Sequence, residues 1–239
     1  MDPSIAAALE PPEIGLLLRG TQFLPSVART VSQIKRYGDH WRAMASWALA
    51  DESVGSQVPV LVALGDSLAQ GIGASNPELG YVGRLRRGMA AEFGKPPPVV
   101  NLSRSGARIA DVLDVQLLAL AALSAEVTIG TIVCTVGSND LVRSPRLGRA
   151  CREMDALLES LPGTAIVATV PANGSVAASL FNRRLRSTAE KNQIKVADIS
   201  VALRSWRGKQ AEDRFHPNDA GYEVWSTAFR QQLATPVAA

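Results

Sequence analysis

Histidine and cysteine are scarce in this chain, and their scarcity narrows its chemistry. The 239 residues include two histidines, His40 and His216, and two cysteines, Cys134 and Cys151. Cys134 lies in the apolar run 131–136, which predicts a small buried side chain rather than a nucleophile or half of a disulfide. No structural disulfide is required, and this permits a cytoplasmic location.

Long hydrophobic runs are also missing near the N-terminus. The apolar stretch from Ile14 to Leu18 spans only five residues, and it follows the acidic residues Asp2, Glu10 and Glu13. We therefore expect neither a cleavable signal peptide nor a transmembrane span, and we expect a cytoplasmic protein.

A strong charge of either sign is absent as well. Lysine and arginine number 25 against 22 acidic residues, a formal charge of +3. Three arginines, Arg183, Arg184 and Arg186, share one predicted helix. We interpret them as a solvated helix face, with a patch for an anionic substrate or a membrane surface as the alternative. We expect no nucleic-acid partner, because duplex binding would have to rest on these arginines alone.

The hydrophobic content of 46% is enough for one sizeable core. We predict a helical extension and linker over residues 1–56 and one main domain over 57–239. The pattern from 25 to 50 is helical, with an apolar stripe that includes Ile34 and Trp41. We expect this helix to pack on the main domain. The alternative is a surface for peripheral membrane association, a lipid substrate or a second copy of the chain.

Strands and helices alternate beyond residue 57. Apolar runs predict five buried strands, at 58–64, 99–102, 127–136, 164–170 and 194–199. Helical spacing separates them, at 81–93, 109–123, 147–161 and 176–192, with a last helix at 220–233. This order predicts an α/β protein, a three-layer α/β/α sandwich around a five-stranded parallel sheet. In such folds ligands bind beyond the carboxyl ends of the strands.

Polar segments containing catalytic residue types stand where such a site would form. Segments 65–73, 101–106 and 137–140 follow the first three strands, and segment 213–218 precedes the last helix. Taken alone, the Gly-Asp-Ser turn at 65–67 could be a helix N-cap or a phosphate site. A P-loop is absent, as is the Gly-x-Ser-x-Gly nucleophile elbow.

Acyl transfer by a serine needs a base beside the hydroxyl. His40 lies in the predicted N-terminal helix, where we interpret it as a surface or packing residue. His216 is therefore the candidate base for Ser67. Asp213, three residues before His216, is placed to accept a hydrogen bond from Nδ1 and hold the useful tautomer. An ordinary pair of loop residues is the alternative interpretation of this Asp-x-x-His spacing.

Together, the four segments resemble the four blocks of the SGNH (GDSL-type) serine hydrolase family. The match consists of Gly-Asp-Ser-Leu at 65–68, Asn101 through Gly106, Gly-x-Asn-Asp at 137–140 and Asp-x-x-His at 213–216. The resemblance spans about residues 58–233 and implies a flavodoxin-like fold. The helix before residue 50 falls outside the family pattern.

The resemblance also implies roles for these residues. Ser67 is then the nucleophile, with Asp213 and His216 completing the triad. The oxyanion hole is made by the backbone N–H groups of Ser67 and Gly106 and the side-chain amide of Asn139. Neutral N–H donors suit this task because they face developing negative charge without carrying charge themselves.

Further side chains near the predicted site have supporting or solvent-facing interpretations. We expect Asp66 and Asp140 to fix the loops through bonds to backbone N–H groups. Arg104 and Arg108 are interpreted as solvated loop residues, with contact to an acidic part of the substrate as the alternative. We expect no metal ion and no cofactor.

The predicted activity is therefore hydrolysis of a carboxylic ester through an acyl-enzyme. The acyl group can be small, part of a lipid, or an acetyl group on a sugar. An acyltransferase with the same residues is the first alternative, because an alcohol can replace water as acceptor. A catalytically silent binding module on the same scaffold is the second, and the intact Ser67 and His216 argue against it.

Overall fold

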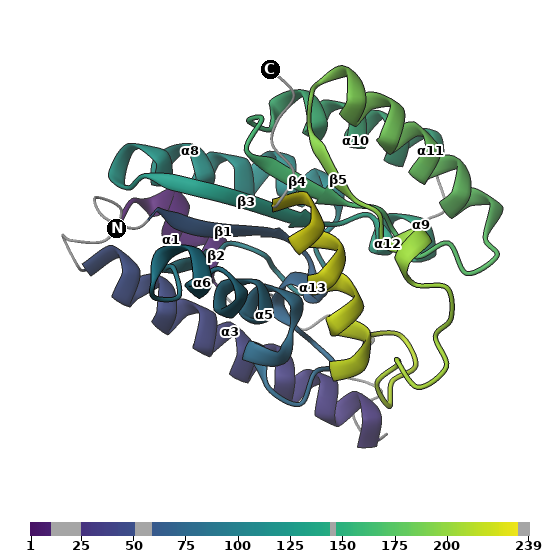
Figure 1. Cartoon of the computed structure of the whole chain (residues 1–239), viewed down its shortest axis with the longest axis horizontal. Coiled ribbons are helices and arrows are strands. Elements are labelled where there is room, and N and C mark those ends of the chain that lie inside the picture. Colours follow the sequence, from purple (N-terminus) through teal and green to yellow (C-terminus); the bar gives the residue numbers. More distant parts are fainter. Residues whose placement is uncertain (11–24, 51–58, 144–146, 234–239) are drawn as a thin grey trace.

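The computed structural model describes residues 1–10, 25–50, 59–143 and 147–233. Its centre is a sheet of five parallel strands in the order β2-β1-β3-β4-β5 (Figure 1). The strands are β1 (Val60–Gly65), β2 (Val99–Asn101), β3 (Ile129–Thr135), β4 (Ala165–Ala168) and β5 (Lys195–Ala197). The predicted five-stranded α/β sandwich is confirmed, and most of the strands are shorter at their ends than the apolar runs.

The strands are apolar throughout because both faces of the sheet are covered. In β1, Val60, Val62 and Leu64 contact one helical layer. Leu61 and Ala63 contact the other. All six residues of β1 are buried, which explains why its sequence shows no polar alternation.

Helices form a layer on each face of this sheet (Figure 1). One layer contains α1 (Pro3–Leu9), α8 (Leu117–Glu126), α10 (Leu147–Ser160) and α11 (Val176–Lys191). The other contains α5 (Tyr81–Gly88), α6 (Ala90–Phe93) and α13 (Asp219–Leu233), while α3 (Pro25–Ala50) lies along the β2 edge and contributes side chains to both layers. The Tyr81 and Phe229 rings stack with centroids 4.8 Å apart and join α5 to α13.

Two predicted helices are interrupted in the structure. The pattern at 81–93 forms α5 and α6, which meet at Met89. The pattern at 109–123 begins as α7 (Ile109–Asp111), continues as a π-helical turn η2 (Val112–Gln116), and only then becomes α8. Apolar periodicity did not reveal these breaks, because the buried face continues through them.

Short helical segments follow the carboxyl ends of three strands, and the first two of them begin within the predicted polar segments 65–73 and 137–140. They include α4 (Ser67–Gln70) after β1, α9 (Ser138–Arg143) after β3 and α12 (Ile199–Ala202) after β5. A further short helix, η1 (Pro77–Leu79), precedes α5. Helix starts at these points direct backbone N–H groups toward the same edge of the sheet.

The helix predicted at 25–50 is present over the same residues, as α3. Its buried side chains include Ile34, Tyr37 and Trp41. The helix packs beside β2, an edge strand of the sheet, and thereby covers it. Trp47 is exposed. Association of α3 with a membrane or a second copy stays a prediction, as does the domain division, and the predicted linker lies outside the described residues.

Several single-residue interpretations can be compared with the structure. Cys134 is fully buried in β3, and burial raises the pKa of its thiol, so the prediction of a core residue is confirmed. Two arginines of α11 are paired, Arg184 with Asp155 and Arg186 with Asp198. His40 is half-buried, with Nε2 3.2 Å from a carboxylate oxygen of Glu78. None of the helices among the described residues combines the length and hydropathy of a membrane span.

Candidate active site

The structure brings Ser67, His216 and Asp213 into one hydrogen-bonded chain. Nε2 of His216 lies 2.9 Å from Oγ of Ser67. Nδ1 of the same ring lies 2.6 Å from Oδ2 of Asp213. The side chains of Ser67 and His216 are separated by 149 positions in sequence and are both buried. A hydroxyl, an imidazole and a carboxylate in this order can activate the hydroxyl for attack on a carbonyl.

The backbone before Ser67 is held where only glycine fits. Gly65 has φ +120°, and a Cβ there would lie 2.0 Å from the carbonyl oxygen of Thr135 on β3. Asp66 caps α4, because its Oδ1 accepts a 2.9 Å bond from the N–H of Leu68. These two residues turn the chain sharply from β1 into α4 and place Ser67 at the first position of that helix.

Gln116, in the π-helical turn η2, holds the turn between β1 and α4 through two hydrogen bonds to Gly65. This residue was not selected from the sequence. Its Oε1 accepts a 2.7 Å bond from the N–H of Gly65, and its Nε2 donates a 2.9 Å bond to the carbonyl of Gly65. The residue is fully buried and lies at the end of the π-helical turn. A glutamine on an apolar stripe is a weak signal, and π-turns often mark functional sites.

The surroundings of Asp213 favour its ionised form beside the imidazole of His216. Its Oδ1 accepts bonds of 3.0 Å from the backbone N–H groups of Phe215 and His216. Burial alone would raise the pKa of Asp213, but the hydrogen bonds and charge of His216, together with these backbone donors, lower it well below its ordinary value. The carboxylate is therefore available to orient Nδ1–H.

The loop that carries His216 and Pro217 packs tightly against the residues that follow α4. Gly73 has φ +97°, and a Cβ there would lie 2.7 Å from Cβ of His216 and 2.4 Å from the carbonyl oxygen of Pro217. The hydroxyl of Tyr222 donates a 2.6 Å bond to the carbonyl of Ile72, next to this contact. The position of the imidazole is thus set by backbone packing as well as by Asp213.

The predicted oxyanion residues Asn139 and Gly106 belong to the segments next to the turn that carries Ser67. Asn139 is buried, and its Nδ2 donates a 3.0 Å bond to the carbonyl of Ala107. The same nitrogen lies 3.4 Å from Oδ2 of Asp66. Asn139 thus links the residue before Ser67 to the residue after Gly106. Gly106 adopts φ +85°, a conformation that favours glycine.

Asp140 holds the loop that follows Gly106. Its Oδ2 accepts a 3.2 Å bond from the N–H of Ile109. The side chain is buried, and burial raises the pKa of Asp140 to about 6. Its contact with a backbone N–H agrees with the predicted loop-fixing role. Asp66 makes the corresponding contact at the start of α4.

Two further polar residues support the nucleophile turn, and their roles were not assigned from sequence. Gln70 donates a 2.8 Å bond from Nε2 to the carbonyl of Ser103 and accepts a 2.8 Å bond from Oγ of Ser105. Asn101 donates a 2.9 Å bond from Nδ2 to the carbonyl of Ala69. These bonds tie α4 to the loop after β2.

A cavity of about 280 Å³ opens beside Ser67, and most of its wall is apolar. Its apolar side chains include Leu68, Leu141, Val170, Trp206, Phe215 and Trp225. Trp225 is fully buried, whereas Phe215 is 43% exposed at the rim. A cavity of this composition accommodates a hydrocarbon group better than a charged one.

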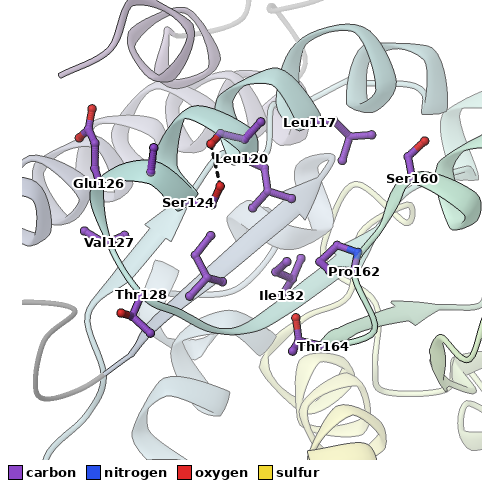
Figure 2. Close-up of a pocket in the computed structure, with 13 residues that line it drawn as sticks. Leu117, Leu120, Ser124, Glu126, Val127, Thr128, Ile132, Ser160, Pro162 and Thr164 are labelled. Atoms are coloured by element: carbon purple, nitrogen blue, oxygen red, sulfur yellow. Dashed lines mark hydrogen bonds between the residues drawn. The ribbon is translucent and has the colours of Figure 1, made fainter.

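A larger cavity, of about 810 Å³, lies at the opposite end of the sheet (Figure 2). It is bounded by α8, by residues 127–129 where β3 begins, and by Thr164 before β4. Two of its serines are bonded to backbone carbonyls of their own helices, Ser124 to Ala121 and Ser160 to Ala156. Its lining residues include neither a histidine nor a cysteine.

One predicted interpretation is wrong in the structure. Arg104 is half-buried rather than solvated, and its Nε has no hydrogen-bond partner among the described residues. Its backbone N–H donates a 3.1 Å bond to the carbonyl of Gly65 at the end of β1, which holds this loop against the nucleophile turn. Arg108 is also only partly exposed. In the part of the chain that the structure describes, no His, Cys, Asp or Glu residues group so as to hold a metal ion.

Comparison with known proteins gives a family match and a set of similar folds. A sequence model described as the GDSL-like lipase/acylhydrolase family matches residues 63–224, more than half of the chain. A search of curated proteins finds no match.

Solved structures of similar fold include TesA, at 22% identity and a TM-score of 0.61, covering 73% of this chain and 98% of that one. The lipase Lip_vut3 from a goat rumen metagenome has 21% identity and a TM-score of 0.62, with 76% and 100% coverage. A variant of Axe2, an acetyl xylan esterase from Geobacillus stearothermophilus, has 19% identity and a TM-score of 0.59, with 78% and 99% coverage.

Proposed function

The chain belongs to the GDSL-like lipase/acylhydrolase family and is a carboxylic ester hydrolase, and we propose that it works through an acyl-enzyme on Ser67. One observation carries this proposal. His216 lies 2.9 Å from Oγ of Ser67, whose proton it can accept, and 2.6 Å from Oδ2 of Asp213, whose charge can stabilise the resulting imidazolium.

Acylation begins when Oγ of Ser67 attacks the ester carbonyl carbon. Nε2 of His216 takes the hydroxyl proton as the new C–O bond forms. The imidazole becomes positively charged, and the carboxylate of Asp213 stabilises that charge without taking the proton. The protonated ring then gives its proton to the leaving alkoxide as the ester C–O bond breaks, which releases an alcohol.

The negative charge on the carbonyl oxygen requires donors at the tetrahedral stage. We assign them to the backbone N–H groups of Ser67 and Gly106 and to Nδ2 of Asn139. Nδ2 makes a long 3.4 Å contact with Asp66 in the free protein. A substrate oxygen would replace this contact more readily than the 3.0 Å bond to Ala107.

Deacylation repeats the same steps with water. Nε2 of His216 removes a proton from the water as its oxygen attacks the acyl carbon. The ring then returns a proton to Oγ of Ser67, which leaves as the acyl carbon–Oγ bond breaks. A carboxylic acid is released and the free enzyme is restored.

The apolar cavity beside Ser67 favours an acyl group with several carbons over acetate. Leu68, Val170 and Trp225 offer hydrocarbon contacts, and each buried methylene contributes about 0.8 kcal/mol. We therefore place the acyl chain in this cavity and the alcohol part of the ester toward solvent. Transfer of the acyl group to an alcohol would use the same residues, and comparing acid with new ester formed in the presence of butanol distinguishes the two activities.

The test uses a fluorophosphonate probe and p-nitrophenyl butyrate. The probe should label the wild-type protein once, and Ser67→Ala should abolish labelling. Ser67→Ala and His216→Ala should each lower kcat by on the order of 10⁴- to 10⁶-fold. The double variant should lose no more than either single variant, because the two residues act as a unit.

Ser124→Ala is the matched control, since Ser124 lines the cavity at the far end of the sheet. It should leave labelling and hydrolysis unchanged. Undiminished hydrolysis in a folded Ser67→Ala protein would rule out the proposed nucleophile.

A further inference from the structure

Helix α3 lies outside the residues matched by the family and yet touches the proposed triad. The family match begins at residue 63, whereas α3 covers Pro25–Ala50. Oγ1 of Thr30 donates a 3.2 Å bond to Oδ2 of Asp213. Oδ2 of Asp213 also lies 2.6 Å from Nδ1 of His216.

We propose that Thr30 is a positioning residue of this esterase, which holds the Asp213 carboxylate in the orientation that His216 needs. The inference rests on the proposed function, since it gives Asp213 and His216 the roles described above. It extends that function by making α3 part of the working site.

The hydrogen bonds of Asp213 show why a donor at this point matters. Oδ1 is held by the two backbone N–H groups of Phe215 and His216. Oδ2 faces the imidazole, which must move between neutral and charged forms during each turnover. A second donor on Oδ2 keeps the carboxylate from rotating away when the interaction with the ring weakens.

Helix α3 is anchored firmly enough to supply such a donor. Gln33 accepts a 3.0 Å bond from the N–H of Gly73 and donates a 2.9 Å bond to the carbonyl of Ala74. Trp41 donates a 3.0 Å bond from Nε1 to the carbonyl of Gln70, the last residue of α4. Gln33 and Trp41 are buried. The spacing 30, 33 and 41 puts these side chains on one side of the helix.

This anchoring connects two separate parts of the site. The segment 70–74 continues from the helix that carries Ser67, while Asp213 lies in the loop before α13. Helix α3 packs against β2 and against α4, the helix that carries Ser67 (Figure 1). Helix α3 therefore spans the nucleophile side and the carboxylate side, and Thr30 is its contact with the second.

The charged residues that line the same cavity as Thr30 include Arg29, Glu212, Asp213 and Asp219. Arg29 of α3 pairs with Glu212 at 2.5 Å, and both side chains are more than 60% exposed. This exposed pair adds little energy because solvent screens it. It therefore does not replace the hydroxyl of Thr30.

The experiment compares Thr30→Val with Thr30→Ser in the whole 239-residue chain. Valine keeps the shape of threonine but removes the donor, so we expect kcat for p-nitrophenyl butyrate to fall about 10-fold with KM unchanged. Serine restores the hydroxyl and should recover kcat to within about twofold. Ser32→Ala, at an exposed position of the same helix, is the control and should match wild type.

A second readout reports on the carboxylate directly. The Nδ1 proton of His216 has a strongly downfield NMR resonance when it is bonded to a carboxylate. Thr30→Val should shift or broaden this resonance, and Thr30→Ser should not. Should the valine variant fold poorly, Thr30→Ala is measured in the same way, with urea unfolding to confirm that the samples are folded.

The outcomes separate this inference from the proposed function. If Thr30→Val keeps the wild-type kcat and NMR resonance while Ser67→Ala is inactive, Thr30 has no positioning role and the esterase mechanism stands. If Ser67→Ala remains active, the proposed mechanism itself is wrong. An equal loss in the valine and serine variants would show a packing effect and would also overturn the inference.

Discussion

Each end of the parallel sheet has a cavity, and the hydrogen-bonded Ser67, His216 and Asp213 lie at the smaller of the two. The cavity at the amino end is nearly three times larger, about 810 Å³ against about 280 Å³. The smaller one contains Ser67 and Asp66, next to a buried histidine. The larger one is lined by aliphatic side chains, by Glu126, Thr128 and Thr164, and by serines already bonded to their own helices.

The physical cause lies in the direction of the strands. At the carboxyl ends, short helices such as α4 and α9 begin and expose N–H groups, and polar side chains from distant segments meet there. At the amino ends, β3 starts with partly exposed residues, and the adjoining helix α8 is finishing. Convergence of hydrogen-bonding groups therefore identifies the site, and cavity volume does not.

The largest difference between the two ends should appear in Asn139→Ala. Loss of one oxyanion donor typically lowers kcat by about 10²- to 10³-fold. Asn192→Ala is the comparison at the amino end, because its side-chain amide donates a 2.9 Å bond to the carbonyl of Thr188 in the neighbouring helix α11. It should leave kcat unchanged. Equal rates in the two variants, measured with p-nitrophenyl butyrate, would remove Asn139 from the oxyanion hole.

Stability should depend on pH because a carboxyl group is buried at the carboxyl end. Asp140 has a folded pKa of about 6 against 3.8 in a model peptide. Between these values the folded protein keeps a proton that the unfolded chain has lost. Raising the pH through this window therefore lowers the free energy of unfolding, by on the order of 3 kcal/mol if Asp140 acts alone.

The variant Asp140→Asn tests whether Asp140 causes the free energy of unfolding to fall as the pH rises. Asparagine can still accept the bond from the N–H of Ile109 but does not titrate. Urea unfolding at pH 4 and pH 7 should show the variant gaining stability over wild type as the pH rises. Ser124→Ala, at the amino end, should run parallel to wild type at both pH values. A constant difference between Asp140→Asn and wild type would contradict the raised pKa.

The smallest effect concerns acyl chain length. In the wild type, kcat/KM should rise about fourfold per methylene while the chain fills the apolar cavity. Ala172→Phe narrows that cavity and should remove the preference for longer chains. Ala121→Phe fills part of the amino-end cavity and should leave the preference unchanged. A chain-length profile that shifts only with Ala121→Phe would place the acyl group at the wrong end.

The elements of the fold were predictable because their signals are local. Apolar runs located all five strands, and periodicity placed α3 over residues 25–50. The breaks at Met89 and in the π-turn were not predictable, because a continuous apolar face hides a change of helical type. The helix at 138–143 was also missed, since its first residues carry the polar motif that was interpreted as a loop.

Some residues of the candidate site were predictable from the sequence, and others were not. Ser67, Asp213 and His216 were selected from residue type, scarcity and position after a strand, and the structure brings them into contact. Gln116 and Thr30 were not selected, because each acts through side-chain hydrogen bonds to a segment far away in the sequence. No local pattern distinguishes such a glutamine or threonine from its neighbours on a helix.

The sequence by itself determined the strands and helices of this protein, its catalytic residue types and the order of its motif segments. These follow from hydrophobic periodicity and side-chain chemistry, which act over a few residues. The tertiary structure alone decided which carboxylate bonds to which imidazole. It also decided that Thr30 of α3 would donate a hydrogen bond to Asp213. Those contacts depend on how layers pack across the sheet, and packing is a property of the whole chain.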